Sequence, residues 1–190
     1  MASVTTNEIR PGMKVEIEGQ PYNIVFNEFV KPGKGQAFNR IKLKHLVSGR
    51  VFERTFKSGE KMDLADVEET YMRLLYKEAD GAIFMDDTSF EQVKVNFNQI
   101  GENEQWLLED QVYDVVFYKG TAITVEPPTF MEMKIVETAP GVRGDTASGR
   151  VLKPAMTASG AKIQIPIFID EGEMVKVDTR TGEYVSRVNT

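Results

Sequence analysis

Two lysines in a short segment rich in proline and glycine are the residues of this chain best suited to binding chemistry. The segment reads Lys31-Pro32-Gly33-Lys34-Gly35. Proline fixes one backbone dihedral and glycine accepts positive φ, so the segment predicts a sharp, stiff turn. Because Lys34 has glycine on both sides, no neighbouring side chain shields its ammonium group. We expect a cation that can reach into crowded surroundings, with an ordinary solvated hairpin tip as the alternative.

The segments on both sides of this turn predict the two strands that would carry it. Residues 22–30 are rich in β-branched and aromatic side chains, and residues 38–46 alternate apolar with polar side chains. Both patterns are typical of strands that bury one face. We expect most of the nearby aromatic side chains, namely Phe29, Phe38 and Phe52, to lie in the core of a small barrel.

Strand patterns also dominate the remaining sequence. They occur at residues 13–17, 51–56, 69–77, 82–85, 91–95, 113–118, 121–125, 130–137, 162–169, 174–177 and 184–188. One short helix is expected near residues 103–108, and a long loop with few apolar anchors is expected at residues 140–160. Short strands at regular spacing, separated by glycine turns, indicate an all-β protein made of small closed barrels.

Two breaks in the strand pattern divide the chain into three expected domains. The consecutive prolines Pro127 and Pro128 cannot lie inside a sheet and mark a linker. A second break lies near residues 62–66. The expected domains are residues 1–64, 65–128 and 129–190, each near the lower size limit for an independent core. Five-stranded barrels of the oligonucleotide-binding (OB) type fit the second and third domains.

The net charge of −6 conceals an uneven distribution of charged residues. Residues 1–64 contain 11 basic and 7 acidic side chains, a net charge of +4, whereas residues 65–128 contain 4 and 14, a net charge of −10. Residues 129–190 are neutral, with 8 of each. The first domain is therefore expected to meet a polyanion. Solubility alone is the alternative explanation for the acidic middle domain.

Several classes of function are excluded by residues that the sequence lacks. It has no cysteine and a single histidine, His45, which excludes thiolate and multi-histidine metal sites. Gly144 and Gly149 have the spacing of a phosphate-binding loop, but Arg150 and Val151 follow where Lys and Ser or Thr are required. No convincing nucleophile–base pair is present, so we expect neither an enzyme nor a bound metal or cofactor. The lack of an apolar signal region or long apolar run predicts a cytoplasmic protein without membrane contact.

Two segments of the last domain have residues suited to contact nucleic acid. The glycines at residues 141–146 would let the backbone approach a ligand closely, although an ordinary loop is an equal alternative. Near the C-terminus, Tyr184 could stack on a base and Arg187 could contact a phosphate. Tyr184 is equally suited to a place in the barrel.

Three separated segments together resemble bacterial translation elongation factor P. They read Lys-Pro-Gly-Lys-Gly-Gln-Ala-Phe at 31–38, Val-Glu-Thr-Ala-Pro-Gly-Val-Arg-Gly-Asp-Thr at 136–146 and Val-Asp-Thr-Arg-Thr-Gly-Glu-Tyr-Val-Ser-Arg at 177–187. The resemblance covers essentially the whole chain. The lysine at the tip resembles the β-lysylated branch of the family, because the rhamnosylated branch has arginine there. A paralogous elongation-factor-P-like protein shares residues 137–141 but usually departs at the tip and C-terminus, where this chain matches the elongation factor.

The resemblance implies a fold, a function and partners. The fold would be an N-terminal KOW-like, SH3-like barrel followed by two OB barrels, in an L-shaped arrangement that resembles tRNA. The protein, as a monomer, would bind the 70S ribosome between the P and E sites, contact ribosomal RNA, and promote peptide-bond formation at consecutive prolines. Its Lys34 tip would position the P-site peptidyl-tRNA. A lysine-modifying enzyme would act on Lys34 by β-lysylation, and hydroxylation is expected among the modifications.

The resemblance also implies roles for individual residues. Contacts with peptidyl-tRNA are expected from Lys31, Pro32, Gly33, Lys34, Gly35, Arg40 and Lys42. Contacts with the E-site codon and the small subunit are expected from Gly144, Asp145 and Thr146. Near the C-terminus, contacts with ribosome or tRNA are expected from Tyr184 and Arg187. None of these roles is catalytic. The protein would act through position and charge alone.

Two other classes of function stay open from the residues alone. A general single-stranded RNA-binding OB protein would need exposed aromatic side chains across a barrel face, and its binding would depend steeply on salt. The net charge of −10 in the middle domain argues against an extended RNA groove. A protein–protein scaffold would make the basic first domain incidental. Sedimentation with ribosomes, with and without Lys34, distinguishes the three classes.

Overall fold

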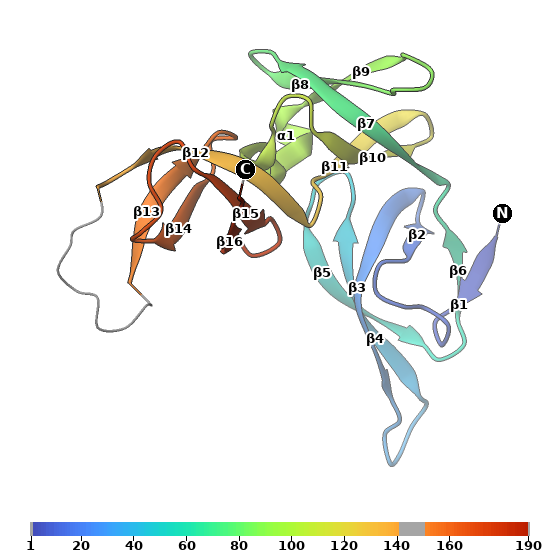
Figure 1. Cartoon of the computed structure of the whole chain (residues 1–190). Helices are drawn as coiled ribbons and strands as arrows, with labels where there is room; N and C mark the ends of the chain where they lie inside the picture. The colour runs from blue at the N-terminus through green and yellow to red at the C-terminus, as the bar shows by residue number, and fades with distance from the viewer. Residues whose placement is uncertain (1, 141–150, 190) are drawn as a thin grey trace. The chain divides into compact units, whose positions relative to one another are not determined.

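The computed structural model describes residues 2–140 and 151–189, which form three antiparallel sheets (Figure 1). Within these residues, helical structure is confined to α1 (Phe97–Ile100) and the 3-10 helix η1 (Gly101–Trp106) that follows it directly. The chain is therefore nearly all-β, and this confirms the fold class expected from the alternating sequence pattern.

The first sheet has the strand order β1-β6-β2-β3-β4-β5. Its strands are β1 (Ser3–Thr5), β2 (Lys14–Ile17), β3 (Gln20–Val30), β4 (Phe38–His45), β5 (Val51–Lys57) and β6 (Lys61–Leu64). Side chains alternate between the two faces of a strand, so β4 buries Ile41 and Leu43 and exposes Arg40 and Lys42. The two buried side chains join one apolar cluster that also contains Val15 from β2.

The second sheet has the strand order β11-β10-β7-β8-β9. Its strands are β7 (Val67–Lys77), β8 (Gly81–Met85), β9 (Gln92–Asn96), β10 (Val112–Tyr118) and β11 (Thr121–Glu126). Phe84 and Tyr113 are both fully buried and meet edge to face, with ring centroids 5.7 Å apart. This aromatic pair lies in the core beneath the sheet and beside the helical segment.

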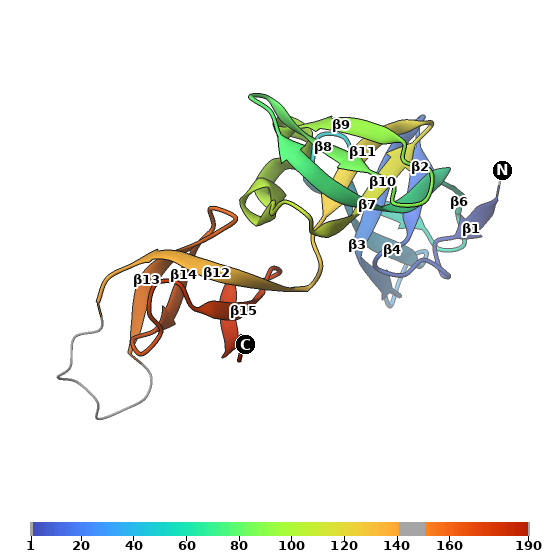
Figure 2. The same ribbon diagram turned by 45° about the horizontal axis from the view of Figure 1, so that its top comes forward.

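The third sheet has the strand order β14-β13-β12-β15-β16. Its strands are β12 (Phe130–Thr138), β13 (Leu152–Thr157), β14 (Lys162–Pro166), β15 (Met174–Asp178) and β16 (Glu183–Arg187). Figure 2 shows β12, β13 and β14 side by side. The regular alternation of β12 buries Met131, Met133 and Ile135, which form the floor of this last core.

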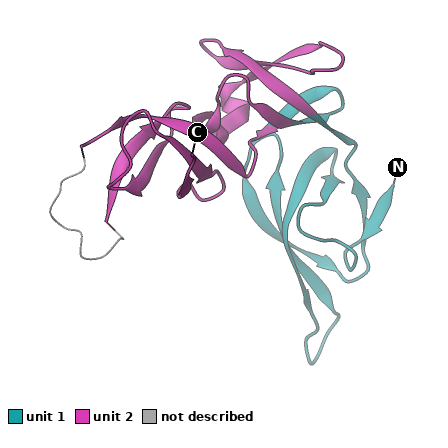
Figure 3. Ribbon diagram, in the orientation of Figure 1, with its two compact units in different colours: residues 1–70, 115–124 teal, residues 71–114, 125–190 magenta. Residues whose placement is uncertain are grey.

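The chain folds into two compact units, drawn in different colours in Figure 3. The first comprises residues 1–70 and 115–124, and the second comprises residues 71–114 and 125–190. The first unit thus takes in the paired ends of β10 and β11, where Val116 and Ile123 form a buried cluster with Leu46. The proposed domain boundaries at residues 64 and 128 follow the sequence and stay a prediction.

Three strands and the helix position differ from the sequence expectation. The short strands β1 and β6 were not expected, and β6 occupies most of the break predicted at residues 62–66. The strand β13 lies inside the stretch 140–160, for which a loop was expected. The helical segment begins at Phe97 and ends at Trp106, rather than spanning residues 103–108.

Candidate functional site

The candidate site is the end of the long ribbon formed by β3 and β4 (Figure 1). The two strands pair from Tyr22 and His45 to Val30 and Phe38, and residues 31–37 close the turn. A register shift between Ile24 and Phe26 places one extra residue on β3. Such bulges bend a strand and increase its twist, which redirects the ribbon as it leaves the barrel.

The turn owes its shape to one proline and one of its two glycines. Gly35 has a φ of +114°, which only glycine adopts readily. A Cβ atom added to Gly35 would lie 3.7 Å from Cγ of Pro32, an ordinary contact, so the requirement for glycine is conformational rather than steric. Gly33 has no positive φ, and a Cβ there would meet nothing within 4 Å. Gly35 therefore determines the shape of the turn, and Gly33 leaves open space beside Lys34.

Both lysines of the turn are exposed, as expected from the sequence. Lys31 and Lys34 take part in no recorded ion pair or hydrogen bond with the part of the chain that the structure describes. Lys34 is not folded back onto its own barrel. The turn thus offers an uncompensated positive charge at the end of a paired ribbon, which suits the backbone of a nucleic acid.

Arg40 and Lys42 lie on one exposed face of the ribbon, below the turn. Arg40 is 3.5 Å from carboxylate oxygens of both Glu28 and Glu53, on the strands to either side. The Nζ atom of Lys42 lies 5.7 Å from the centroid of the Phe26 ring. Lys42 is about 13 Å along the strand from Phe38 by the usual rise per residue. The structure therefore separates these two cations from the tip and engages both with neighbours.

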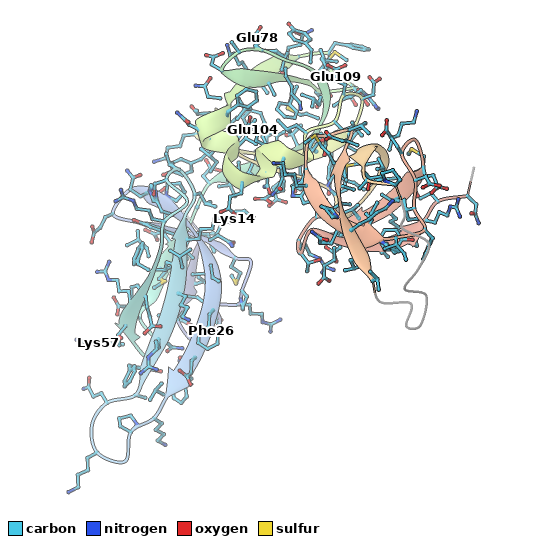
Figure 4. The ribbon with its side chains drawn as sticks, turned by 90° about the vertical axis from the view of Figure 1, so that its left-hand side faces the viewer. Lys14, Phe26, Lys57, Glu78, Glu104 and Glu109 are labelled. Carbon is cyan, nitrogen blue, oxygen red and sulfur yellow. The ribbon has the colours of Figure 1, made fainter. Side chains whose placement is uncertain are left out.

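Aromatic side chains of β3, β4 and β5 are more exposed than the sequence predicted. Phe29 is 55% exposed and Phe52 is 40% exposed, so the expectation that both lie in the core is wrong, and Phe38 is half-buried. Phe26 is also exposed, on the side of the ribbon seen in Figure 4. Phe29 lies beside the last strand pair before the turn, where the ribbon extends beyond the barrel and no core covers its inner face, whereas Phe26 lies on the outer face opposite Lys42.

A buried polar cluster fixes the root of the ribbon to the N-terminal segment. Nδ2 of Asn39 donates to Oδ1 of Asn27 at 3.0 Å and to the carbonyl of Thr6 at 3.2 Å. Nδ2 of Asn27 donates to the same carbonyl and to the carbonyl of Ile9, both at 3.0 Å. Because Asn39 is 1% exposed, these bonds hold both strands at the point where they leave the core. This cluster was not predicted, since isolated asparagines on strands form no recognisable motif.

The C-terminal candidates lie in two different hollows on β16. Tyr184 is half-buried and lines a hollow with residues of η1 and β14. Arg187 pairs with the carboxylate of Glu173 and lines another hollow with Gly172. The structure therefore does not combine Tyr184 and Arg187 into one site. The other expected contacts, Gly144, Asp145 and Thr146, lie outside the described residues.

Neither a metal-binding cluster nor a membrane-spanning helix is found among the described residues. Within residues 2–140 and 151–189, no group of three His, Cys, Asp or Glu side chains is arranged to hold a metal ion. None of the helical segments in that same part of the chain has the length and apolar character needed to cross a bilayer. His45 is engaged between Ser48, 2.7 Å from Nδ1, and Gln20, 3.1 Å from Nε2.

Family models cover nearly the whole chain in three consecutive matches. They are described as elongation factor P KOW-like domain over residues 5–62, elongation factor P OB domain over residues 67–125, and elongation factor P, C-terminal, over residues 131–187. The chain belongs to the elongation factor P family. The resemblance stated from sequence is thereby confirmed, and with it the KOW-like and OB folds. Membership makes the chain a translation elongation factor by descent.

Full-length relatives agree with this assignment. Elongation factor P 2 of Protochlamydia amoebophila is 70% identical over 190 residues, and elongation factor P 2 of Chlamydia caviae is 63% identical over 189 residues. Each comparison covers 100% of both chains. The likeness therefore extends through all three sheets and includes the ribbon.

Solved structures of lower sequence identity show the same fold. Eukaryotic translation initiation factor 5A from Methanococcus jannaschii is 21% identical with a TM-score of 0.53, covering 66% of this chain and 94% of its own. A translation initiation factor eif-5a family protein from Naegleria fowleri is 15% identical with a TM-score of 0.50, covering 65% and 94%. At these identities the likeness concerns the fold alone.

Proposed function

We propose that this chain binds the 70S ribosome between the P and E sites and promotes peptide-bond formation at consecutive prolines. In this proposal the Lys34 tip lies against the acceptor end of the P-site peptidyl-tRNA. The observation that carries it is the exposed, uncompensated ammonium of Lys34 at the end of a ribbon fixed at its root. The protein acts as a cytoplasmic monomer, and ribosomal RNA provides the rest of its binding surface.

The proposed mechanism is positional. Proline restricts the nascent chain because its ring fixes φ, so the peptidyl-tRNA can rest in an unproductive geometry. A cation held beside the sugar–phosphate backbone restrains that tRNA through charge-assisted hydrogen bonds. Holding two reactants in a near-attack geometry lowers the entropic part of the barrier, and about 1.4 kcal/mol corresponds to a tenfold rate. No group of the protein needs to enter the reaction.

Lys34 is also the proposed site of modification. A primary amine that is exposed, free of ion pairs among the described residues and flanked by glycines is accessible to a modifying enzyme. Extension by β-lysylation adds length and a second amine, which increases the reach of the tip toward the tRNA. Hydroxylation adds a further hydrogen-bonding group. Intact-mass measurement of protein from its native host, followed by peptide mapping, reports the increment on Lys34.

The decisive experiment is translation of a message with consecutive proline codons in a reconstituted system. We expect Lys34→Ala to abolish the relief of stalling while the thermal unfolding midpoint stays unchanged, because the exposed Lys34 side chain forms no hydrogen bond or ion pair within the described residues. Lys34→Arg should also fail if modification is required, because a guanidinium is a poor acceptor for lysylation. The matched control is Lys61→Ala, which removes an exposed lysine of the same sheet away from the ribbon.

Undiminished rescue by Lys34→Ala would refute the positional role of the tip. Sedimentation with ribosomes provides a second readout. The unsubstituted chain should sediment with 70S particles, whereas failure to do so at moderate salt would refute ribosome binding itself.

A further inference from the structure

A polar hollow in the second compact unit lies apart from the residues of the Lys34 tip. It has a volume of about 950 Å³ and lies between η1 and the outer face of β13 and β14. The turn between β15 and β16 closes one end of it, where a Cβ added to Gly182 would lie 3.9 Å from the ring of Trp106. None of the residues of the Lys34 ribbon contributes to its lining.

The hollow lies on a surface that OB barrels use for nucleic acid. In the third sheet, β12 to β16 are the five strands of the barrel in chain order. OB folds bind oligonucleotides on the face of their second and third strands, with help from the loop that joins the fourth and fifth. In this chain those elements are β13, β14 and residues 179–182, and all of them line the hollow.

The lining is rich in uncharged hydrogen-bonding groups. Asn103 and Gln105 come from η1, Gln164 from β14, and Thr181 from the turn. Tyr184 adds an aromatic ring from β16. Amides and hydroxyls can pair with the edges of a nucleobase, and an aromatic ring can stack on its face.

The charges around the hollow nearly cancel. The lining contains the cations Lys162 and Arg180 and the anions Glu102 and Glu183. Arg180 is held by Asp178, with Nη2 at 2.7 Å from Oδ2, and this hydrogen bond lowers the pKa of the Asp178 carboxyl. Lys162 is exposed and has no recorded ion pair with the described residues. Because Lys162 is the one cation of this lining without an ion pair among the described residues, the hollow suits a nucleobase with a single phosphate better than a run of several phosphates.

We propose that this hollow binds one unstacked base of a single-stranded RNA, with the adjoining phosphate on Lys162. The inference goes beyond the function proposed above, because it assigns a base-binding site to the hollow, whereas the family resemblance implies only a contact of Tyr184 with ribosome or tRNA. The base stacks on Tyr184 and pairs with the amide of Gln164 and the amide oxygen of Asn103, whose Nδ2 already donates to the carbonyl of Val125 at 2.8 Å and to Oε2 of Glu126 at 3.1 Å.

The chain contains a reporter for this binding, since Trp106 lines the hollow and is the only tryptophan in the sequence. Titration of the full chain with a uridine hexamer should quench its fluorescence. Tyr184→Ala should weaken binding about tenfold, the usual scale for loss of one stacking partner. Gln164→Ala should also weaken it, and this exposed residue can be truncated without disturbing the core.

Two controls separate this inference from the proposed function. Lys134→Ala, on an exposed position of β12 outside the hollow, should bind the hexamer as the unsubstituted chain does. Lys34→Ala should also bind it normally, even though it fails in translation. The affinity should fall only slightly with salt, because about one phosphate is engaged. No quenching at millimolar hexamer, or equal binding by all variants, would overturn the proposal.

Crosslinking tests the same contact on the ribosome. The chain has no cysteine, so Lys162→Cys introduces a single attachment point for a photoactivated probe. RNA crosslinks from position 162, absent from a matched Lys134→Cys variant, support the inference. Crosslinks confined to ribosomal protein, or none at all, count against it.

Discussion

Gly33 and Gly35 flank the same lysine, but the backbone requires glycine only at the second. Gly35 has a φ of +114°, whereas Gly33 has no positive φ and open space around it. An L-residue in the left-handed region costs roughly 1–2 kcal/mol, and a short turn can avoid this cost by changing shape. The direction of the Lys34 side chain therefore depends on Gly35.

Alanine substitutions at these two glycines form a matched pair. We expect Gly35→Ala to reduce relief of stalling at consecutive prolines by tenfold or more, because the turn rearranges and carries Lys34 away from its target. Gly33→Ala should retain most of the activity, because a Cβ at this position meets nothing within 4 Å. Both variants should unfold at nearly the same temperature as the parent, because the turn lies outside the core. Equal activity of the two variants would contradict the role assigned to Gly35.

At the residue scale, the sequence predicted the tip well and its surroundings poorly. Glycine on both sides of Lys34 is a local signal, and local signals can be read from a sequence. The exposure of Phe29 depends instead on how far the ribbon extends beyond the barrel and on the register shift before Phe26. Alternation reports which face a side chain lies on, but not whether that face is covered.

At the scale of elements, a single tyrosine holds the helical segment in place. The hydroxyl of Tyr113, on β10, donates to the carbonyl of Trp106 at 2.6 Å and accepts from the backbone N–H of Leu108 at 2.8 Å. Burial raises the pKa of the Tyr113 hydroxyl to about 12. Tyr113 thus supports the end of η1, which forms one wall of the polar hollow.

The raised pKa of Tyr113 predicts a loss of stability in alkaline solution. Between pH 10 and 12 the unfolded chain loses the phenolic proton and the folded chain keeps it, so the unfolded state binds fewer protons and stability falls as pH rises. Tyr113→Phe should lower the free energy of unfolding at pH 7 by about 1–2 kcal/mol and reduce the alkaline decline. Chemical denaturation at pH 7 to 11 measures both effects. Tyr71→Phe, which alters a 73% exposed side chain, should change neither.

The asparagine cluster at the root of the ribbon predicts a second loss of stability. Asn39→Ala removes two hydrogen bonds from a buried position and leaves the Asn27 amide oxygen and the Thr6 carbonyl with fewer donors. We expect the free energy of unfolding to fall by about 1–3 kcal/mol. Denaturant titration measures the change, with Gln36→Ala in the exposed turn as control. A loss no larger than that of the control would mean that the cluster does not fix the ribbon.

Elements with regular alternation were predictable, and those defined by distant partners were not. The pattern of β12 identifies its buried face directly. The strand β13 contains Pro154, which argues against a central strand. In the structure Pro154 is matched with Gln164 of β14, whereas the pairing with β12 begins at Ala155, so the proline takes part in the register on one side only. The three-residue strand β1 exists only because β6 lies beside it, and no local signal specifies that pairing.

At the scale of the whole molecule, the paired ends of β10 and β11 belong to the first compact unit. The Tyr118 hydroxyl donates to Oε2 of Glu16 at 2.7 Å, and Nζ of Lys119 lies 3.6 Å from the same carboxylate oxygen. Leu46 packs in the apolar cluster beneath them with Val116. Residues separated by about half of the chain therefore stabilise one another.

A double-mutant cycle measures this long-range stabilisation. Tyr118→Phe and Glu16→Ala should each lower the free energy of unfolding, and the double variant should lose less than the sum, with a coupling energy of roughly 0.5–1.5 kcal/mol. Equilibrium denaturation of the four proteins provides the values. Tyr76→Phe, on the partly exposed end of β7, serves as a neutral control. Strict additivity would show that the hydrogen bond adds nothing to stability.

The hairpin of β10 and β11 has a consequence for protein engineering. A chimera that exchanges residues 65–128 as a cassette between two homologues would import a hairpin shaped for the donor's N-terminal barrel. The donor's residues at positions 118, 116 and 123 would then contact Glu16 and Leu46 of the recipient, which evolved with a different hairpin. A successful chimera should therefore transfer residues 1–70 and 115–124 together, or leave residues 115–124 with the recipient.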